Sequence, residues 1–578
     1  MKKILITIAV AACMVTPAWS TWIHDWSRTM GSTGIDEGKC IASDQNNYSV
    51  SSGTFTGSVD FDPGPGIATL STVGGTGTDM YLVKKSTSGT FVWAKQVGGT
   101  GTAEPRSIII QDGGGDIYVC GSFFGQIDFN LGASPSAVKN SAGADDAFIA
   151  RYSISTGALV WVTIFGGTGQ DAGHDVHFDG AGNVLMTGYF QGSVNFATGA
   201  GKNTLVSNAG SVDVFFGRYA MSTGLTGWMK GFGGTGIDVG DGICCDASSF
   251  IYLCGHFQSS TMDVDPGTGT FNLSMTGIQD AFFGRYTLSA GNFSTWAYHF
   301  GSASVDNRAT DIAYNNDATT PELVLTGFVN GSVTFPGGGP LFLSSNRDAY
   351  ILSYNPSGTY LWGNGFPGSS GNEEGTDIVR SGDYIYACGY FENTVDFDIS
   401  STSSVTAVSA GLTDAFMLRY NESGVFKDVA GFGSTGVDGA NGISAFNAPN
   451  VTFLTGYFEG TVDFDPDAGV ANKVSMGSMD LFHNRYSWTT PTRLSGFTTA
   501  HTLVPFPNPA SDRLFINDVK EGDVIEIYSV AGQLCTSQTM RYDGQAELDV
   551  SSLENGVYLL LISSGGESSR SERIVIQH

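Results

Sequence analysis

Short runs of alternating apolar and polar residues, separated by turns rich in Gly, Ser, Asn and Asp, extend through residues 21–488. In residues 161–228 the pattern predicts four strands, at 175–178, 184–196, 213–219 and 225–232. Apolar runs of this length and period are typical of β-strands, and no long stretch has helical periodicity. The pattern therefore predicts an all-β chain of short antiparallel strands.

The four-strand unit is repeated about every 67 residues. The third strand of each copy begins with an Asp that is followed two positions later by Phe or Tyr: Asp79, Asp146, Asp213, Asp280, Asp348, Asp414 and Asp480. A Trp follows most of these acids in the fourth strand: Trp93, Trp161, Trp228, Trp296 and Trp362, with Trp26 and Asp428 at the same place at the two ends of the series. Seven copies of four strands predict a seven-bladed β-propeller.

The two ends of the repeat region complement each other. The last copy stops after its third strand, at residues 480–486, and residues 22–30 form a fourth strand without the other three. Pairing these two segments would close the ring and remove an edge that could aggregate. The Trp residues are expected to pack between neighbouring blades.

A second domain follows a linker at residues 489–501 that contains Thr, Ser and Pro. Residues 502–578 hold alternating strands with polar turns, which predict a small β-sandwich. Its motifs include PNP, GQ and NGVY segments, whose residues are Pro507, Asn508, Pro509, Gly532, Gln533, Asn555, Gly556 and Tyr558.

Both domains resemble known families. The repeated Gly-Gly-Thr-Gly, Thr-Gly-Tyr-Phe and Asp-Ala-Phe segments resemble the bacterial seven-bladed propeller repeat family called SBBP. Residues 502–578 resemble the C-terminal sorting domain of the type IX secretion system of Bacteroidetes. This second resemblance implies recognition by the type IX secretion machinery, removal of the domain, and a body that is released or attached to surface lipopolysaccharide. The segment at residues 155–161 also resembles the Trp-docking repeat of quinone-dependent dehydrogenases, but their eight blades and cofactor site are not visible here.

Residues 1–20 read as a secretory signal peptide, with Lys2 and Lys3, an apolar stretch at 4–15, and Ala-Trp-Ser before the cleavage point. A rival interpretation is a lipoprotein in which Cys13 is acylated. The apolar stretch is too short to span a membrane, and no later segment qualifies. The sequence thus predicts a secreted or cell-surface protein without a transmembrane segment.

Charge narrows the range of partners. The chain has 55 acidic and 27 basic residues, a formal charge of −28, and no cluster of Lys and Arg. Nucleic acid and anionic lipid therefore have no electrostatic basis for binding. Divalent cations suit such a surface better.

The clearest candidate cation site is the VDFDPG segment, which recurs at the end of the second strand of several units. Its copies diverge, so we interpret it as a blade-tip turn whose acids share one acidic rim with the repeated Asp and with the acids that follow the Gly-Gly-Thr-Gly segments. The repeated Asp are expected to accept backbone N–H bonds and fix the turn at the start of the strand, with a cation-binding ring as the alternative. No cofactor is required, and Ca²⁺ is the one ion considered. The expected ligands lie in the first and last units: Asp60, Asp62, Asp463, Asp465 and Asp467.

Other reactive side chains are interpreted as structural. Cys120, Cys254 and Cys388 occupy a small, buried repeat position, although Cys244 or Cys245 could bridge to Cys254 across a hairpin. His174 and His177 stand three residues apart on a strand, so they are expected on opposite faces. No nucleophile elbow, zinc-protease motif or Walker loop is present in the sequence.

We therefore expect a monomeric binding or scaffold protein that acts on an extracellular glycan or protein ligand and is not an enzyme. The alternative is a secreted polysaccharide-active hydrolase or lyase on a propeller scaffold. Such an enzyme needs paired carboxylates. The near-equivalence of the blades favours binding, while acids or histidines unique to the channel mouth would favour catalysis.

Overall fold

The computed structural model describes two segments of the chain, residues 22–488 and 505–578. Within them it omits 75–76, 112, 114, 133–135, 198–202, 316–320, 369–370, 399–403, 447–449, 468, 530–533 and 564–569. The predicted signal peptide with Cys13, the predicted linker, Gly532 and Gln533 lie outside the described residues. Two compact units result, and each is considered by itself.

The larger unit contains, among its described residues, seven four-stranded antiparallel sheets, one of which carries two further short strands. The strands of the first four, from inside to outside, are β2 (Glu37–Ser43), β3 (Ser49–Phe55), β6 (Asp79–Lys85) and β7 (Phe91–Gly99); β8 (Thr102–Ile110), β9 (Ile117–Phe124), β12 (Asp146–Tyr152) and β13 (Leu159–Phe165); β14 (Ala172–Phe178), β15 (Asn183–Gln191), β18 (Val212–Ala220) and β19 (Thr226–Phe232); β20 (Asp238–Cys245), β21 (Phe250–Phe257), β24 (Asp280–Thr287) and β25 (Phe293–Phe300).

The last three sheets follow the same order. They are β26 (Arg308–Asn315), β27 (Glu322–Thr334), β28 (Leu341–Tyr354) and β29 (Tyr360–Gly365); β30 (Glu374–Ser381), β31 (Tyr384–Phe391), β34 (Asp414–Asn421) and β35 (Phe426–Phe432); and β36 (Gly439–Phe446), β37 (Val451–Phe458), β40 (Asp480–Trp488) and β1 (Trp22–Met30). The chain thus runs outward through each sheet before it enters the next.

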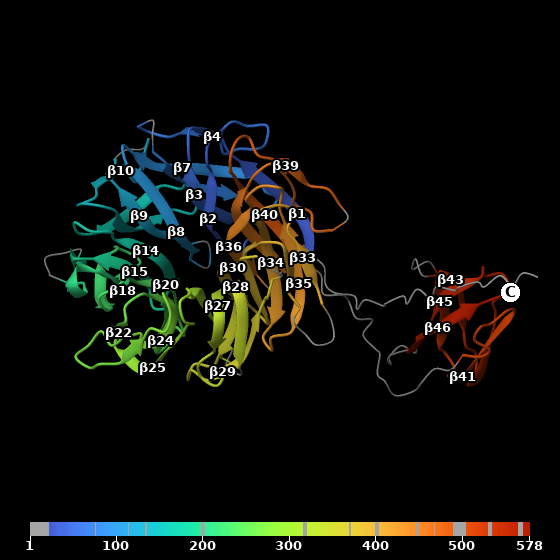
Figure 1. Cartoon of the computed structure of the whole chain (residues 1–578). Helices are drawn as coiled ribbons and strands as arrows, with labels where there is room; N and C mark the ends of the chain where they lie inside the picture. Colours follow the sequence, from blue (N-terminus) through green and yellow to red (C-terminus); the bar gives the residue numbers. More distant parts are fainter. Residues whose placement is uncertain are drawn as a thin grey trace, which may run out of the picture. The chain divides into compact units, whose positions relative to one another are not determined.

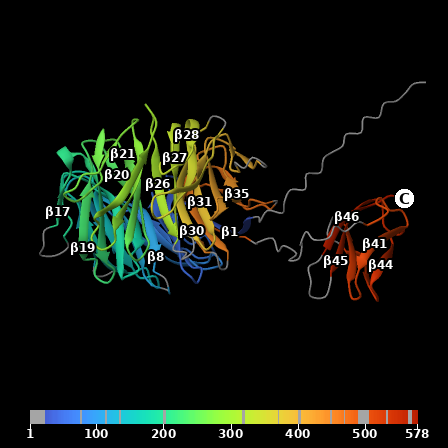
Figure 2. The ribbon, with the colours of Figure 1, turned by 90° about the horizontal axis from the view of Figure 1, so that it is seen from below.

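The sheets are arranged around a common centre (Figures 1 and 2). Each innermost strand contacts the innermost strand of the following sheet, and β36 contacts β2. This radial arrangement is that of a β-propeller. The last sheet is completed by β1, which pairs antiparallel with β40 from Trp22 opposite Trp488 to Met30 opposite Leu481.

A short two-stranded ribbon follows the second strand of most sheets. The segment expected as a single strand at 184–196 is therefore two strands, β15 and the ribbon strand β16. The ribbons are β4 (Ser58–Asp60) with β5 (Thr69–Ser71), β10 (Gln126–Asp128) with β11 (Val138–Asn140), β16 (Ser193–Asn195) with β17 (Thr204–Val206), β22 (Thr261–Asp263) with β23 (Asn272–Ser274), β32 (Thr394–Asp396) with β33 (Thr406–Val408), and β38 (Thr461–Asp463) with β39 (Asn472–Val474).

Helix is nearly absent from the part of the chain that the structure describes. It consists there of one 3-10 turn, η1 (Asn208–Gly210), which is far too short to cross a membrane.

The Trp side chains pack between neighbouring sheets. Trp93 Nε1 donates to the Ile154 carbonyl at 3.2 Å, and Trp161 Nε1 donates to the Met221 carbonyl at 3.0 Å. A turn glycine of the next sheet lies against each ring, for example Gly157 against Trp93, with φ +67°. A Cβ there would overlap the indole, so the glycine is needed both for the turn and for the contact.

Asp428 replaces the Trp in the sixth sheet. Its carboxylate pairs with Arg419 at 2.7 Å, and both side chains are buried. The Arg419 guanidinium in turn lies 3.6 Å from the centre of the Trp488 ring. A buried ion pair stacked on an aromatic ring therefore fills the interface that an indole fills elsewhere.

The smaller unit has two antiparallel sheets among its described residues. One pairs β41 (Arg513–Val519) with β44 (Gly544–Asp549), and the other orders β43 (Leu534–Thr539), β42 (Val524–Ser529), β45 (Gly556–Ser563) and β46 (Arg570–Ile576). Leu514, Ile527, Leu560 and Ile574 belong to one shared core. Asn508 bonds the backbone of β46 at Arg573 and Val575, at 3.0 and 2.8 Å, which fixes the motif segment to the sheet.

Candidate functional site in the central channel

Every innermost strand carries a β-bulge at the same position. The pairing with the second strand skips one residue in each of the seven sheets: Lys39, Arg106, His174, Asp241, Thr310, Thr376 and Asn441. All seven residues are polar, and all line a central cavity of about 530 Å³. Bulges redirect side chains, and here they turn a ring of seven polar groups toward the channel.

One side of this ring is neutral and fully paired. Thr310 Oγ1 donates to the Gly375 carbonyl at 2.5 Å, and Thr376 Oγ1 donates to the Ala440 carbonyl at 2.8 Å. Asn441 Nδ2 donates to the Gly38 carbonyl at 2.8 Å. Each bond joins one sheet to the next, so these bulge residues hold the ring together.

The other side of the ring is charged and centres on Asp241. Arg308 donates to both carboxylate oxygens, at 2.6 and 3.1 Å, and His256 Nδ1 lies 2.6 Å from Oδ2. Burial disfavours the carboxylate, but the charge of Arg308 and the two histidines hold the pKa of Asp241 well below its usual range. Asp241 therefore stays ionised inside the channel.

His174 extends this cluster toward the cavity. Its Nδ1 lies 3.1 Å from Asp241 Oδ1, and because a carboxylate only accepts, we assign the proton to Nδ1. Burial and the charge of Arg106 lower the pKa of His174 to about 4, so the ring is neutral at pH 7. Nε2 is then an acceptor, and it has no hydrogen-bond partner among the described residues.

Three further acids face the channel one position beyond the bulges. Asp175, Asp311 and Asp377 each accept a backbone N–H of the following sheet, from Ile243, Ile378 and Ile443, at 2.8–3.0 Å. Burial raises their pKa values, to about 7 for Asp175 and about 6 for Asp377, and Asp311 hydrogen-bonds Asp377. These acids connect neighbouring sheets at the centre of the ring.

The repeated Asp residues accept backbone N–H bonds, as expected of acids that fix a turn, but they do not form the expected acidic rim, and that expectation is wrong. All seven repeated Asp side chains are buried, with at most 4% exposure, and most accept a backbone N–H of the preceding loop, as Asp146 does from Ala142 at 3.1 Å. The first glycine of the Gly-Gly-Thr-Gly segment lies against this carboxyl, where a Cβ would overlap it. Five of the acids after that segment are buried too, namely Asp36, Asp171, Asp238, Glu373 and Asp438, while Asp306 is partly exposed.

The candidate calcium ligands lie in the exposed ribbons. Asp60 Oδ1 accepts the N–H groups of Asp62 and Ala68, at 3.0 and 2.8 Å, and Asp463 Oδ1 accepts those of Asp465 and Ala471, at 3.1 and 2.7 Å. Asp62 and Asp465 each accept one N–H two residues on. Nowhere in the described chain do three or more His, Cys, Asp or Glu gather as a metal site. One oxygen of each of these four carboxylates therefore closes the turn in which it lies.

Two other expectations also change. His174 and His177 both line the central cavity, because the bulge at His174 breaks the strict alternation on which the expectation of opposite faces depended. Cys244, Cys245 and Cys254 are free thiols, so the hairpin disulfide is not formed. Cys120, Cys254 and Cys388 are buried.

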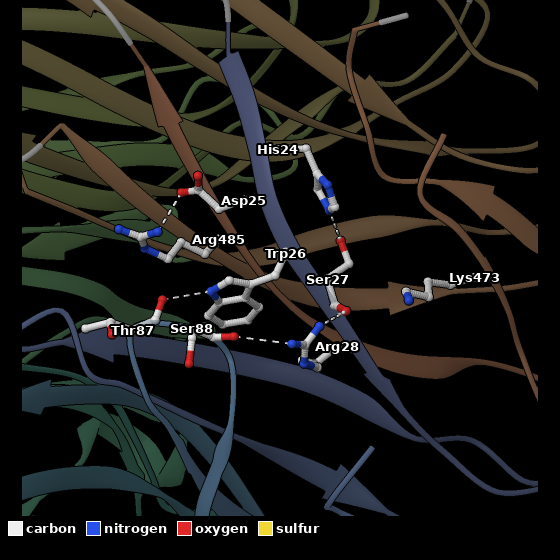
Figure 3. Close-up of a pocket in the computed structure, with 9 residues that line it drawn as sticks. All are labelled: His24, Asp25, Trp26, Ser27, Arg28, Thr87, Ser88, Lys473 and Arg485. Carbon is white, nitrogen blue, oxygen red and sulfur yellow. Dashed lines mark hydrogen bonds and ion pairs between the residues drawn. The ribbon is translucent and has the colours of Figure 1, made fainter. Parts of the chain in front are cut away.

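A second hollow, of about 710 Å³, lies beside the closing strand β1 (Figure 3). Its polar groups pair with one another: Asp25 with Arg485 at 2.8 Å, Trp26 Nε1 with the Thr87 carbonyl at 3.0 Å, and Arg28 Nη2 with the Ser88 carbonyl at 3.3 Å. The bonds from Trp26 and Arg28 fix β1 to the first sheet, and the Asp25–Arg485 pair joins β1 to β40. The channel is therefore the stronger candidate site.

Residues 505–577 match the family described as "Secretion system C-terminal sorting domain". This match confirms the predicted export by type IX secretion to the cell surface or the outside, and it implies contact with that secretion machinery. Within the domain, Asn508 Oδ1 accepts the N–H of Val575 in β46, and Asn555 Oδ1 accepts the His578 N–H, both at 2.8 Å.

Comparisons of the whole chain give distant matches. The chain is 21% identical over 516 residues to the "Uncharacterized WD repeat-containing protein L264" of Acanthamoeba polyphaga mimivirus, covering 76% of this chain and 36% of that one. The chain thus spans about a third of the length of this curated relative.

Two solved structures are also similar. A quinohemoprotein alcohol dehydrogenase from Comamonas testosteroni has a TM-score of 0.36 at 11% identity, covering 85% of this chain and 79% of that one. PorZ, described as an essential bacterial surface component of the type IX secretion system of Porphyromonas gingivalis, has a TM-score of 0.20 at 11% identity, covering 94% and 81%.

Proposed function

We propose that this protein is a secreted or cell-surface binding scaffold: a monomeric seven-bladed propeller of the SBBP type, from a member of the Bacteroidetes, carrying a removable β-sandwich sorting domain. The seven sheets and the contact of β36 with β2 support the blade number. The proposed ligand site is the charged side of the channel.

The observation that carries this proposal is the ring of bulges. Packing residues such as the Trp and the repeated Asp recur from blade to blade, whereas the bulge residue changes from Lys to Arg, His and Asp. Polar groups that differ between blades and face one cavity are suited to orient a ligand in a single way.

A polysaccharide-active enzyme is the second candidate, favoured by the Asp241–His174 pair, which resembles the arrangement that orients a general base. Two features count against it. A histidine with a pKa of about 4 is a weak base at neutral pH. The acid pair that lines the channel, Asp311 and Asp377, is hydrogen-bonded together, closer than the roughly 5 Å that glycosidases need.

The test is an array of extracellular glycans and proteins probed with the secreted protein, together with an assay for newly released reducing ends. Binding without release supports a scaffold. Release of reducing ends that is lost in His174→Gln would replace the scaffold with the enzyme.

A further inference from the structure

A third hollow lies beside the central cavity, between the first and second sheets. This hollow has a volume of about 560 Å³ and shares Lys39 and Arg106 with the central cavity. The two cavities therefore adjoin at Lys39 and Arg106, and we call the two together the groove between β2 and β8.

Hydroxyl groups line the outer part of the groove. They belong to Thr54, Thr56, Thr78, Thr102 and Ser122, and exposed Ile35 adds an apolar contact. A hydroxyl both donates and accepts hydrogen bonds, so this wall matches a partner that also carries donors and acceptors in equal measure.

The outer part of the groove carries charges of both signs, from three acids and two bases. Lys39 pairs with Glu37 at 2.5 Å and lies 3.7 Å from Glu104, which also lies 3.6 Å from Arg106. A polyanion would meet the two glutamates, with Asp145 at the outer end, and a polycation would meet Lys39 and Arg106. An uncharged chain meets neither repulsion.

The inner end of the groove holds a donor and an acceptor that lack partners. Arg106 Nε is buried without a hydrogen-bond acceptor, and His174 Nε2 is buried without a donor, among the described residues. Buried groups of this kind cost stability unless something satisfies them. A hydroxyl placed between the two groups would satisfy both, because it can accept from Arg106 and donate to His174.

We propose that the groove between the first and second blades binds a neutral carbohydrate chain, with one sugar hydroxyl held between Arg106 and His174 at its inner end. This inference rests on the proposed binding function and names the ligand class for the same site.

The experiment is native affinity electrophoresis of the secreted protein in gels that contain dextran, laminarin or galactomannan, with polygalacturonate and dextran sulfate as charged counterparts. We expect at least one neutral polysaccharide to retard the protein. His174→Gln, Arg106→Gln and Arg106→Lys should each weaken that interaction about tenfold. Lysine keeps the charge but loses the Nε donor, so it separates hydrogen bonding from general attraction.

Arg347→Gln is the matched control. It also removes one cation, but Arg347 pairs with Asp306 in the fifth sheet and lines neither cavity. It should bind as the parent does, and thermal melts of all variants check folding. Ser122→Ala gives a second, milder loss in the outer groove.

The inference would be overturned if no neutral polysaccharide retards the protein, or if only polyanions do. It would also be overturned if the His174 and Arg106 variants bind as the parent does. A protein ligand found on the array in those cases would leave the binding function standing. Failure to bind anything on the array would remove both.

Discussion

The outer and inner edges of the blades differ in how closely their side chains repeat. At the outer edge the same contact is built again and again: an indole, a turn glycine and a carbonyl about 60 residues further on. At the inner edge the backbone repeats, bulge included, but the side chain on the bulge differs in nearly every blade. Repetition therefore serves stability at the outer edge, while the bulge position, which faces the cavity, varies from blade to blade.

Removing an indole should have the largest effect. Trp296 is 7% exposed, and its Nε1 bonds the Pro356 carbonyl at 3.3 Å. Trp296→Ala should lower the free energy of unfolding by about 3–5 kcal/mol, measured by denaturant melts, while ligand binding stays intact. A large loss of binding in a variant that is still folded would break the division between the two edges.

Replacing Lys85 with the Tyr found at this place in other blades should raise stability. Lys85 is fully buried, and its Nζ bonds the Phe61 carbonyl at 2.7 Å, a role that Tyr152, Tyr286 and Tyr486 perform with their hydroxyls in other blades. Burial lowers the pKa of Lys85 to about 7, despite Asp62 and Asp60 nearby. Lys85→Tyr should raise the free energy of unfolding at pH 7 by about 2–4 kcal/mol.

The pH dependence gives the sign of this effect. Between pH 7 and about 10 the unfolded chain binds the Lys85 proton and the folded protein does not, so stability rises with pH in that window. Lys85→Tyr should remove this rise between pH 7 and 9.5. An unchanged slope would show that Lys85 keeps its proton in the folded protein.

The pairing of the glycine with the repeated Asp predicts a smaller loss. Gly166→Ala should cost about 1–3 kcal/mol, because its Cβ overlaps the Asp146 carboxyl. The added cost should shrink in an Asp146→Ser background, since the smaller side chain makes room. Strictly additive effects in this double-mutant cycle would contradict the coupling.

On the inner edge we expect little change in stability. His174→Gln keeps a donor for Asp241, which still has Arg308 and His256. The free energy of unfolding should therefore change by less than about 1 kcal/mol. Thr376→Val, on the paired side of the ring, should cost more because it removes the bond to the Ala440 carbonyl. A reversed order would mean that the charged side also serves stability.

The smallest effect should come from chelation. Because the ribbon carboxylates already close their own turns, EDTA should shift Tm by less than about 1 °C. A larger drop that disappears in Asp463→Asn would establish a Ca²⁺ site in the last blade.

The amino-acid pattern predicts the repeated sheets well, because each copy needs the same packing residues at the same positions. The strand expected at residues 22–30 coincides with β1, and the repeated Asp starts the third strand in five of the seven sheets. β18 begins one residue earlier, at Val212, and Asp348 lies within the longer strand β28. The bulges are not predicted by simple alternation, since the extra residue shifts the faces: β14 begins at Ala172, before the expected segment at 175–178. A recurring small–polar–x–Ile pattern, as in Gly375 to Ile378, does mark the bulge.

The backbone bonds of the repeated Asp can be predicted from their place at a strand start, but the burial of the acids cannot. An Asp in a polar loop reads as exposed unless the backbone donors that surround it are known, as they are for Asp36 with Ser32 and Thr56 at 2.6 and 2.7 Å. The pairing of Asp241 with both His174 and Arg308 joins three blades, and spacing alone cannot bring such residues together.

The pairing of β1 with β40 sets an order of events. In a chain that is made and exported from its N-terminus, the first strand of the propeller must wait for the last before it has a partner. Contacts between such distant segments form late in folding. A truncated chain would keep β1 and the edge of its last sheet unpaired. The ring can therefore close only when the whole propeller is present.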